Sequence, residues 1–279
     1  MIIRCWGARG SVPVSGKEYL KYGGDTPCVE IRSKNDEIIV VDAGSGIRRL
    51  GNRLMAEKRY AVSMLFTHAH WDHLIGFPFF KPIYSKKSKI TMYGCPYSEE
   101  SVKHMISRIM SAPNFPVDFN DIHADIIYNE SCGTDFSIDS IRIQSIPISH
   151  PNQGVGYKFI ENGKELVFIT DNELNFKHPG GLDYQDYVAF SKGADLLIHD
   201  AEFIEQDYKK ARTWGHSVYK DTLRLALDAK VKKLGLYHHN QDRTDSAIDE
   251  MVGNCNSIIA QHASSLECFA VYQDMEIRL

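Results

Sequence analysis

Residues 67–73, Thr-His-Ala-His-Trp-Asp-His, constrain the fold of this chain more than any other stretch. They follow residues 62–66, a largely apolar run that is short and bounded by polar residues and therefore predicts a buried strand. Side chains two residues apart along an extended strand point to the same side, so His68 and His70 can bind one metal ion together. Imidazole nitrogen is a good ligand for zinc or iron. The stretch therefore predicts a metal site at the end of a strand.

Asp72 and His73 follow at once, where we expect the chain to turn into a helix that starts near Leu74. Their side chains can therefore face a second position close to the first. The carboxylate also accepts harder ions such as manganese. The alternative is a solvated loop that is merely rich in histidine. Three imidazoles and a carboxylate within residues 68–73 make a metal site the better interpretation.

Length and composition argue against several other classes of protein. The 279 residues are 43% hydrophobic, which is ample for a packed core and argues against a disordered chain. The formal net charge of -4 and the pI of about 6.3 do not favour a long polyanionic partner, so a nucleic-acid duplex is a weaker candidate for the substrate. Length alone permits one large domain or two ordinary ones.

Cysteine usage and the start of the chain indicate an enzyme of the cytoplasm. The six cysteines are scattered and form no CxxC pair, so neither a zinc knuckle nor a disulfide framework is expected. Reduced, mostly buried thiols are the better interpretation. The first residues place a charge at Arg4 and lack the long apolar core of a signal peptide. No stretch approaches the roughly 20 apolar residues that a membrane span requires. We therefore expect a cytoplasmic enzyme with no membrane partner.

Further candidate site residues stand where a predicted strand ends or just beyond it. The strands are residues 38–41, 141–148, 166–170, 194–198 and 233–237, and the candidates that follow them are Asp42, His150, Asp171, Asp200 and His238. The alternative for Asp42 is a cap of the helix expected over residues 47–58. His150 could also be a simple turn residue before proline, and Asp171 an exposed acid in a loop.

The HxHxDH form of residues 68–73, with its companions in order along nearly the whole chain, resembles the metallo-β-lactamase fold superfamily of metal-dependent hydrolases. The resemblance implies an α/β fold, a four-layer αββα sandwich made of two similar halves. We find no internal repeat, low-complexity segment or linker in the sequence. We therefore expect one hydrolase domain over residues 1–279.

The resemblance also assigns ligands to two divalent metal ions. One ion would be held by His68, His70 and His150, the other by Asp72, His73 and His238, and Asp171 would bridge the two. Asp42 would hold the metal loop through hydrogen bonds without touching a metal. Zinc is the usual ion of the superfamily, and manganese or iron would fit the same ligands.

Two later segments resemble the pair that positions a general acid in tRNase Z and its phosphodiesterase relatives. They are His199-Asp-Ala-Glu202 and Gly215-His-Ser217, with Asp200 in the place of the usual glutamate. Contact with Asp200 would orient the imidazole of His216 and favour its charged form, so that His216 can protonate the leaving oxygen. Hydroxide shared by two metal ions would be the nucleophile. We therefore expect His216, Asp200 and Asp72 to take part in catalysis, Asp72 as a ligand as well.

The resemblance narrows the substrate to a small phosphodiester. tRNase Z carries a long tRNA-gripping arm between the equivalents of His150 and Asp171, whereas one compact hairpin separates these residues here. We expect hydrolysis of a 3′,5′-cyclic nucleotide, and do not expect a long nucleic acid as substrate. The alternatives are an RNA 3′-end nuclease, a hydrolase of a cyclic phosphate in phosphonate metabolism, a lactonase or thioesterase, and a metal-binding sensor that uses the fold as a scaffold.

Aromatic side chains gather after the metal loop. Trp71, Phe77, Phe79 and Phe80 predict either an apolar wall on which a base could stack or ordinary core packing. Residues 99–110 have the apolar spacing of a helix. The next ten residues, 111–120, interrupt regular structure and predict a flap over the site or a contact in a homodimer.

Overall fold

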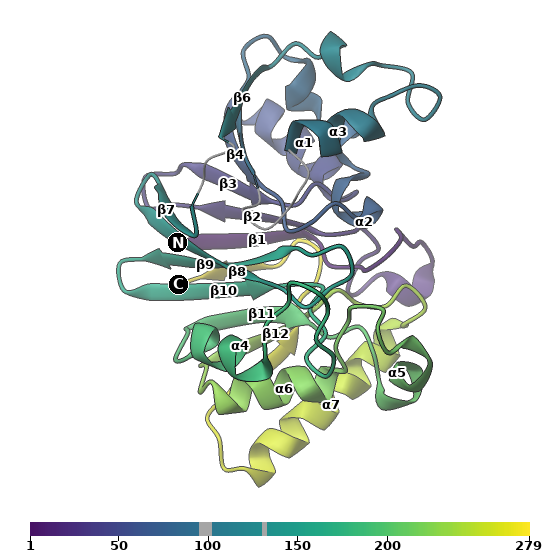
Figure 1. The fold of residues 1–279 in the computed structure, drawn as a ribbon, viewed down its shortest axis with the longest axis vertical. Coiled ribbons are helices and arrows are strands. Elements are labelled where there is room, and N and C mark those ends of the chain that lie inside the picture. Colours follow the sequence, from purple (N-terminus) through teal and green to yellow (C-terminus); the bar gives the residue numbers. More distant parts are fainter. Residues whose placement is uncertain (95–101, 130–132) are drawn as a thin grey trace.

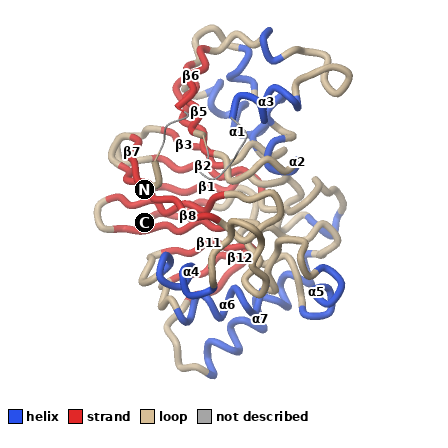
Figure 2. Tube along the Cα trace, viewed as in Figure 1, coloured by secondary structure: helices blue, strands red, loops and turns tan. Residues whose placement is uncertain are grey.

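The computed structural model describes residues 1–94, 102–129 and 133–279. Two β-sheets pack face to face in the middle of the molecule, and helices cover the outer face of each sheet (Figure 1). Figure 2 shows the same layers by type of structure, with blue helices above and below the red strands. This order of layers confirms the four-layer αββα sandwich predicted from the sequence.

The first sheet has seven strands in the spatial order β14-β1-β2-β3-β4-β5-β6. Their bounds are β1 Ile2–Gly7, β2 Cys28–Arg32, β3 Ile38–Val41, β4 Ala61–Leu65, β5 Lys89–Tyr93, β6 Asp125–Asn129 and β14 Glu276–Arg278. Pairing is antiparallel from β14 to β3 and parallel from β3 to β6. The last strand of the chain thus returns to pair with the first.

The second sheet has seven strands in the order β13-β12-β11-β10-β9-β8-β7. Their bounds are β7 Asp135–Ile138, β8 Ile141–Pro147, β9 Val155–Glu161, β10 Lys164–Ile169, β11 Leu196–Asp200, β12 Lys233–Tyr237 and β13 Glu267–Ala270. Pairing is antiparallel from β7 to β10 and parallel from β10 to β13. Each sheet therefore joins an antiparallel part to a parallel part, as two similar halves would.

Helices α1 and α3 lie over the first sheet, and α4, α6 and α7 over the second (Figure 1). The helices are α1 Ile47–Ala56, α2 Trp71–Leu74, α3 Val102–Ile109, α4 Tyr184–Ser191, α5 Glu205–Ala211, α6 Tyr219–Asp228 and α7 Asp245–Gln261. Short 3₁₀ helices are η1 Lys17–Tyr19, η2 Phe77–Phe79, η3 Lys81–Tyr84 and η4 Phe119–Asp121. In the described part of the chain, no helix combines the length and the apolar character that crossing a bilayer requires.

Strand β3 shows why both faces of the sheets are apolar. Successive side chains of a strand point to opposite faces. Ile39 and Val41 pack into the core between the two sheets, whereas Ile38 and Val40 pack into the core under the helices. A strand covered on both faces therefore appears in the sequence as a continuous apolar run.

The structure refines several predicted boundaries. Helix α2 begins at Trp71, not near Leu74, so Asp72 and His73 lie within it. Strand β11 continues through His199 to Asp200. Strands β6, β7 and β14 and helix α4 were not predicted. The predicted helix over residues 99–110 is found as α3, but its first part lies outside the described residues.

The described cysteines agree with the predicted reduced state. Cys5, Cys28, Cys255 and Cys268 are free and buried. Cys95 and Cys132 lie outside the described residues.

Candidate metal centre

The candidate ligands converge where the two sheets meet. Strand β4 ends shortly before His68, and α2, which carries Asp72 and His73, lies at this edge of the first sheet (Figure 1). From the second sheet, β10 ends just before Asp171 and β12 just before His238. Carboxyl ends of parallel strands meet at one edge of a sheet, which explains why residues far apart in sequence become neighbours.

One cluster contains His68, His70, His150 and Asp171, which can each offer one ligand atom within 4.8 Å of the others. The Nε2 atom of His68 lies 3.6 Å from Oδ2 of Asp171, and Nε2 of His150 lies 3.9 Å from the same oxygen. Nε2 of His150 is also 3.0 Å from Nδ1 of His70. This group has the composition predicted for the first ion.

A second cluster contains Asp72, His73, His238 and the same Asp171, again within 4.8 Å. The Nε2 atom of His73 lies 3.3 Å from Oδ1 of Asp171, and Nε2 of His238 lies 3.3 Å from its Oδ2. Asp72 is 3.0 Å from His238 and 3.3 Å from His73. Asp171 therefore contacts both clusters, the arrangement that a bridging carboxylate requires.

A carboxylate behind the second cluster orients one of its imidazoles. Asp42 is fully buried and accepts hydrogen bonds from the backbone and the hydroxyl of Thr67, both at 2.8 Å. Its Oδ2 also lies 2.8 Å from Nδ1 of His73, which leaves Nε2 to face the cluster. The alternative role as a helix cap is wrong, because the N-cap residue of α1 is Gly46.

Two similar supports were missed by the sequence analysis. Oε2 of Glu202 lies 2.9 Å from Nδ1 of His238, and the carbonyl oxygen of Gly215 lies 2.8 Å from Nδ1 of His150. A signal for Glu202 existed, because this carboxylate stands two residues after the end of β11. No sequence signal identifies a backbone carbonyl as the partner of an imidazole.

Three site residues adopt the left-handed backbone conformation that side chains rarely take. The φ angles are 63° at Asp42, 52° at Asp171 and 58° at His238. Each of these residues follows a strand, and the unusual φ turns the chain away from the strand direction. Such strain persists only where the surrounding structure holds it, and it concentrates at functional sites.

The N-terminal glycine-rich turn closes over the second cluster. The backbone amide of Ser11 donates to Oδ2 of Asp72 at 2.9 Å. A Cβ atom at Gly10 would lie 2.4 Å from Nδ1 of His238, so only glycine permits this close approach. The turn thus fixes a ligand carboxylate through the backbone.

Charges in the centre favour binding of a cation. Burial holds the pKa of His68 and of His150 well below the usual range, so both are neutral. Burial alone would raise the pKa of Asp171, but the imidazoles of His238 and His73 outweigh burial and hold the pKa well below its ordinary value. Burial disfavours charge on His73 and His238, but the carboxylates of Asp72 and Asp171 outweigh it and raise both pKa values well above the usual range. These two rings therefore carry protons that a bound metal ion would displace, because a ligand imidazole must be neutral.

The unpartnered atoms also fit metal ions. Nε2 of His68 and Nε2 of His73 are buried and make no hydrogen bond with the described residues. Buried polar atoms are normally satisfied, so such atoms call for an explanation. Both nitrogens face Asp171, and a divalent cation in each cluster would satisfy them. The residues present therefore fit the metal centre that the sequence predicts.

His216 lies beside the second cluster, with its ring stacked on that of His238 at 4.8 Å between centroids. Its Nδ1 lies 2.6 Å from Oδ2 of Asp200 and 3.4 Å from Oε2 of Glu202. Burial disfavours the charged imidazole, but the carboxylates of Glu202 and Asp200 outweigh it and raise the pKa of His216 to about 9. The shorter side chain of Asp200 therefore still reaches His216.

Glu173 is a further site residue that the sequence analysis missed. This buried carboxylate accepts hydrogen bonds from the backbone amides of Thr213 and Gly215, at 2.9 and 2.8 Å. It also accepts from the hydroxyl of Tyr208 and lies 2.8 Å from Nε2 of His178. Glu173 thereby fixes the loop that contains Gly215 and leads into His216.

The sequence of this chain matches a family model described as "Beta-lactamase superfamily domain" over residues 37–239. The match covers most of the chain. The matched segment includes Asp42, the metal loop, Asp171 and His238.

Curated proteins with similar sequences are named ribonuclease Z. The protein of Haloarcula marismortui is 23% identical over 266 residues, which cover 79% of this chain and 82% of that protein. The protein of Sulfurisphaera tokodaii is 27% identical over 245 residues, which cover 76% of this chain and 81% of that protein.

Solved structures share the fold over almost the whole chain. The short form of human tRNase Z has a TM-score of 0.64 at 19% identity and covers 100% of this chain and 99% of its own. A diphosphatase of the PhnP family has a TM-score of 0.70 at 14% identity, with coverage of 100% and 97%. The protein YhfI of Bacillus subtilis has a TM-score of 0.68 at 18% identity, with coverage of 99% and 98%. At these identities the likeness establishes the fold alone.

Proposed function

The chain belongs to the β-lactamase superfamily and is a metal-dependent hydrolase acting on phosphodiester bonds, and on this premise we propose that its substrate is a small phosphodiester, a 3′,5′-cyclic nucleotide above all. The observation that carries the proposal is the contact between His216 and Asp200 beside two ligand clusters that share Asp171. This arrangement offers cation sites and a proton donor side by side.

His68, His70 and His150 would hold one ion and Asp72, His73 and His238 the other, with Asp171 between them. Zinc is the ion we propose first, because imidazole and carboxylate ligands suit it, and manganese or iron would fit the same set. When bound, two such ions lower the pKa of a shared water to near neutrality and neutralise charge on the phosphodiester.

His216 is the proposed general acid. With Nδ1 directed at Asp200, Nε2 is the nitrogen left to donate a proton to the leaving oxygen. Glu202 and Asp200 keep the imidazole cationic, which a proton donor requires before each turnover.

The chain between His150 and Asp171 supports a small substrate. Strands β9 and β10 fill this interval and are joined by the two residues Asn162 and Gly163. No room remains there for an arm that could hold a folded RNA. The net charge of -4 also does not attract a long polyanion.

Cleavage of RNA 3′ ends is the second candidate, because the similar curated proteins are named ribonuclease Z. The same two clusters and the same proton donor would serve either reaction. Homodimer formation and a cytoplasmic location stay predictions.

Turnover of metal-reconstituted protein tests the proposal. The panel contains bis-p-nitrophenyl phosphate, the common 3′,5′-cyclic nucleotides, a short RNA with a 3′ extension, a lactone and a thioester. We expect cleavage of at least one cyclic nucleotide, abolished in Asp171→Ala. Cleavage of the RNA alone would replace the first candidate by the second. Cleavage of the lactone or thioester with every diester intact would refute both.

A further inference from the structure

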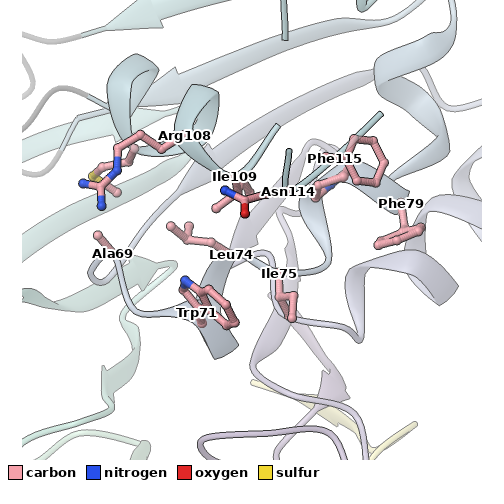
Figure 3. A pocket seen from close by; sticks show the side chains of 11 residues that line it. Ala69, Trp71, Leu74, Ile75, Phe79, Arg108, Ile109, Asn114 and Phe115 are labelled. Carbon is pink, nitrogen blue, oxygen red and sulfur yellow. The ribbon is translucent and has the colours of Figure 1, made fainter. Parts of the chain in front are cut away.

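A cavity of about 500 Å³ opens beside the metal loop (Figure 3). Its walls come from the metal loop with α2, from η2, and from α3 with the segment that follows it. The side chains that line it are Ala69, Trp71, Leu74, Ile75, Pro78, Phe79, Met105, Arg108, Ile109, Asn114 and Phe115. This volume is typical of a small-molecule site, which is mostly apolar with a few polar groups.

The cavity borders the metal loop at residues that are direct neighbours of candidate ligands. His68 and His70 belong to the first metal cluster, whereas the intervening Ala69 and the following Trp71 line the cavity. Each of these two lining residues is therefore bonded along the chain to at least one candidate ligand. A molecule in the cavity would thus lie directly against the loop that holds the metal ligands.

The lining offers a ring-binding surface. Phe77 and Phe80, two members of the predicted aromatic wall, are fully buried in the core. Trp71 and Phe79 are instead 76% and 54% exposed, although large apolar side chains are usually covered. Phe79 is held edge to face by Phe115, with 5.6 Å between ring centroids. An exposed indole that lines the same cavity as a fixed pair of rings is suited to stacking on a flat aromatic ligand.

Polar groups on the opposite wall can read the edge of such a ring. Figure 3 shows Asn114, from the segment after α3, across the cavity from Trp71, and Arg108 on α3 toward Ala69. The amide of Asn114 can donate and accept, and its side chain makes no hydrogen bond with the residues that the structure describes. Arg108 is the one charged side chain among the described lining residues.

We propose that this cavity binds the nucleobase of the substrate, stacked on Trp71 and read at its edge by Asn114, while the phosphodiester lies at the metal centre. The inference rests on the proposed function, since it assigns the base of the same substrate. It also assigns a function to residues 111–120, the segment predicted as a flap, because Asn114 and Phe115 of that segment would line the base site.

Binding of a product-like pair of ligands to the zinc-loaded full chain tests the proposal without turnover. The ligands are a nucleoside 5′-monophosphate and ribose 5-phosphate, which is the same molecule without its base. We expect calorimetry to show at least tenfold tighter binding of the nucleotide, within the range that stacking on an aromatic side chain supplies. Trp71→Ala should remove most of this ratio, and Asn114→Ala should reduce it and alter the ranking of the bases.

Two further variants keep the test decisive. Because Trp71 lies between two ligands, Ile109→Trp fills the cavity from the opposite wall and should lower the ratio with the metal loop intact. Asn256→Ala removes another exposed asparagine, on α7, and should leave the ratio unchanged. An unchanged ratio in both Asn114→Ala and Ile109→Trp would overturn the proposal, even if cyclic nucleotides are cleaved. A change in oligomeric state without a change in the ratio would also overturn it, since the cavity would then belong to a contact between copies.

The same data separate this inference from the proposed function. A base-dependent ratio that these variants remove, in a protein that cleaves no diester, would support the pocket and refute the activity. Cleavage of cyclic nucleotides with a ratio near one would support the activity and refute the pocket.

Discussion

Replacing His216 by alanine should make catalysis depend on the leaving group of the substrate. A proton donor matters only when the departing oxygen is a strong base. An alkoxide, such as the sugar oxygen of a cyclic nucleotide, needs a proton as it leaves, whereas p-nitrophenolate leaves readily without one. We therefore expect His216→Ala to lose most turnover on the first kind of substrate and little on the second.

The expected size of this effect is the general contribution of a positioned proton donor. Proton transfer by a positioned side chain contributes about 10²- to 10⁴-fold to a rate. His216 belongs in this range because its pKa of about 9, against an ordinary 6.5, keeps it protonated at neutral pH. The difference corresponds to about 3 kcal/mol in favour of the charged ring. Alkyl diester cleavage should thus fall about 10²- to 10⁴-fold.

The assay compares kcat/KM for a cyclic nucleotide and for bis-p-nitrophenyl phosphate in the same protein preparations. Metal content and thermal unfolding are measured in parallel, because His216 stacks on the candidate ligand His238. His262→Ala is the matched control, since this exposed histidine at the end of α7 lies outside both clusters. The control should match the unmodified chain on both substrates.

Equal losses on the two substrates, with metal retained, would refute the general-acid role. Asp200→Asn provides a second comparison on the same point. Loss of this carboxylate should lower the pKa of His216 by about 1 to 3. The acid form is required, so activity is present below this pKa and lost as pH rises through it. In the pH profile of kcat/KM for the cyclic nucleotide, the loss of activity at high pH should therefore occur at lower pH in Asp200→Asn than in the unmodified chain. Bound metal is present in both proteins and does not account for the difference.

The remaining predictions concern the ligand clusters and their supports. Asp171→Ala should bind less metal and lose turnover. A chelator should lower the melting temperature of the unmodified chain but hardly that of the variant, because bound metal stabilises only the folded state. Equal metal content of the two proteins by mass spectrometry would contradict the bridging role. Gly10→Ala places a Cβ atom against His238 and should lower metal content. Gly253→Ala is its control, because nothing among the described residues surrounds this position of α7, and it should gain about 0.5–1 kcal/mol of stability in urea unfolding. Glu173→Gln replaces one of the two acceptor oxygens by an amide NH2, so part of the buried donors lose their acceptor. The change should cost about 1–3 kcal/mol in the same assay and reduce turnover; unchanged unfolding would contradict the role of Glu173.

The positions of strand ends could be predicted from the sequence, because they depend on one local run of residues. Asp171 and His238 each follow a buried apolar run, and a strand end is visible in the sequence as the place where such a run stops. The hairpin of β9 and β10 was equally accessible, because Asn162-Gly163 is a local turn signal. These features need no knowledge of what packs beside them.

The features that were missed depend on tertiary contacts. Glu173 contacts a loop about forty residues away, at Thr213 and Gly215. Strand β14 is three residues long and exists only because β1 offers it an edge. The cavity beside Trp71 requires α3 to approach the metal loop, and no local pattern specifies that approach. Sequence periodicity identifies what is buried, and leaves open which elements meet.

Packing between the sheets and geometry at the metal centre follow from the same strands. Leu65 on β4 and Phe168 on β10 pack in the core between the sheets, and the chains that continue from these strands reach His68 and Asp171, which lie 3.6 Å apart. A slip of one residue in either strand would reverse every side chain between the two faces and bury polar groups in that core. The strand register is therefore held by apolar packing, and the separation of ligands from the two halves is fixed before any metal binds.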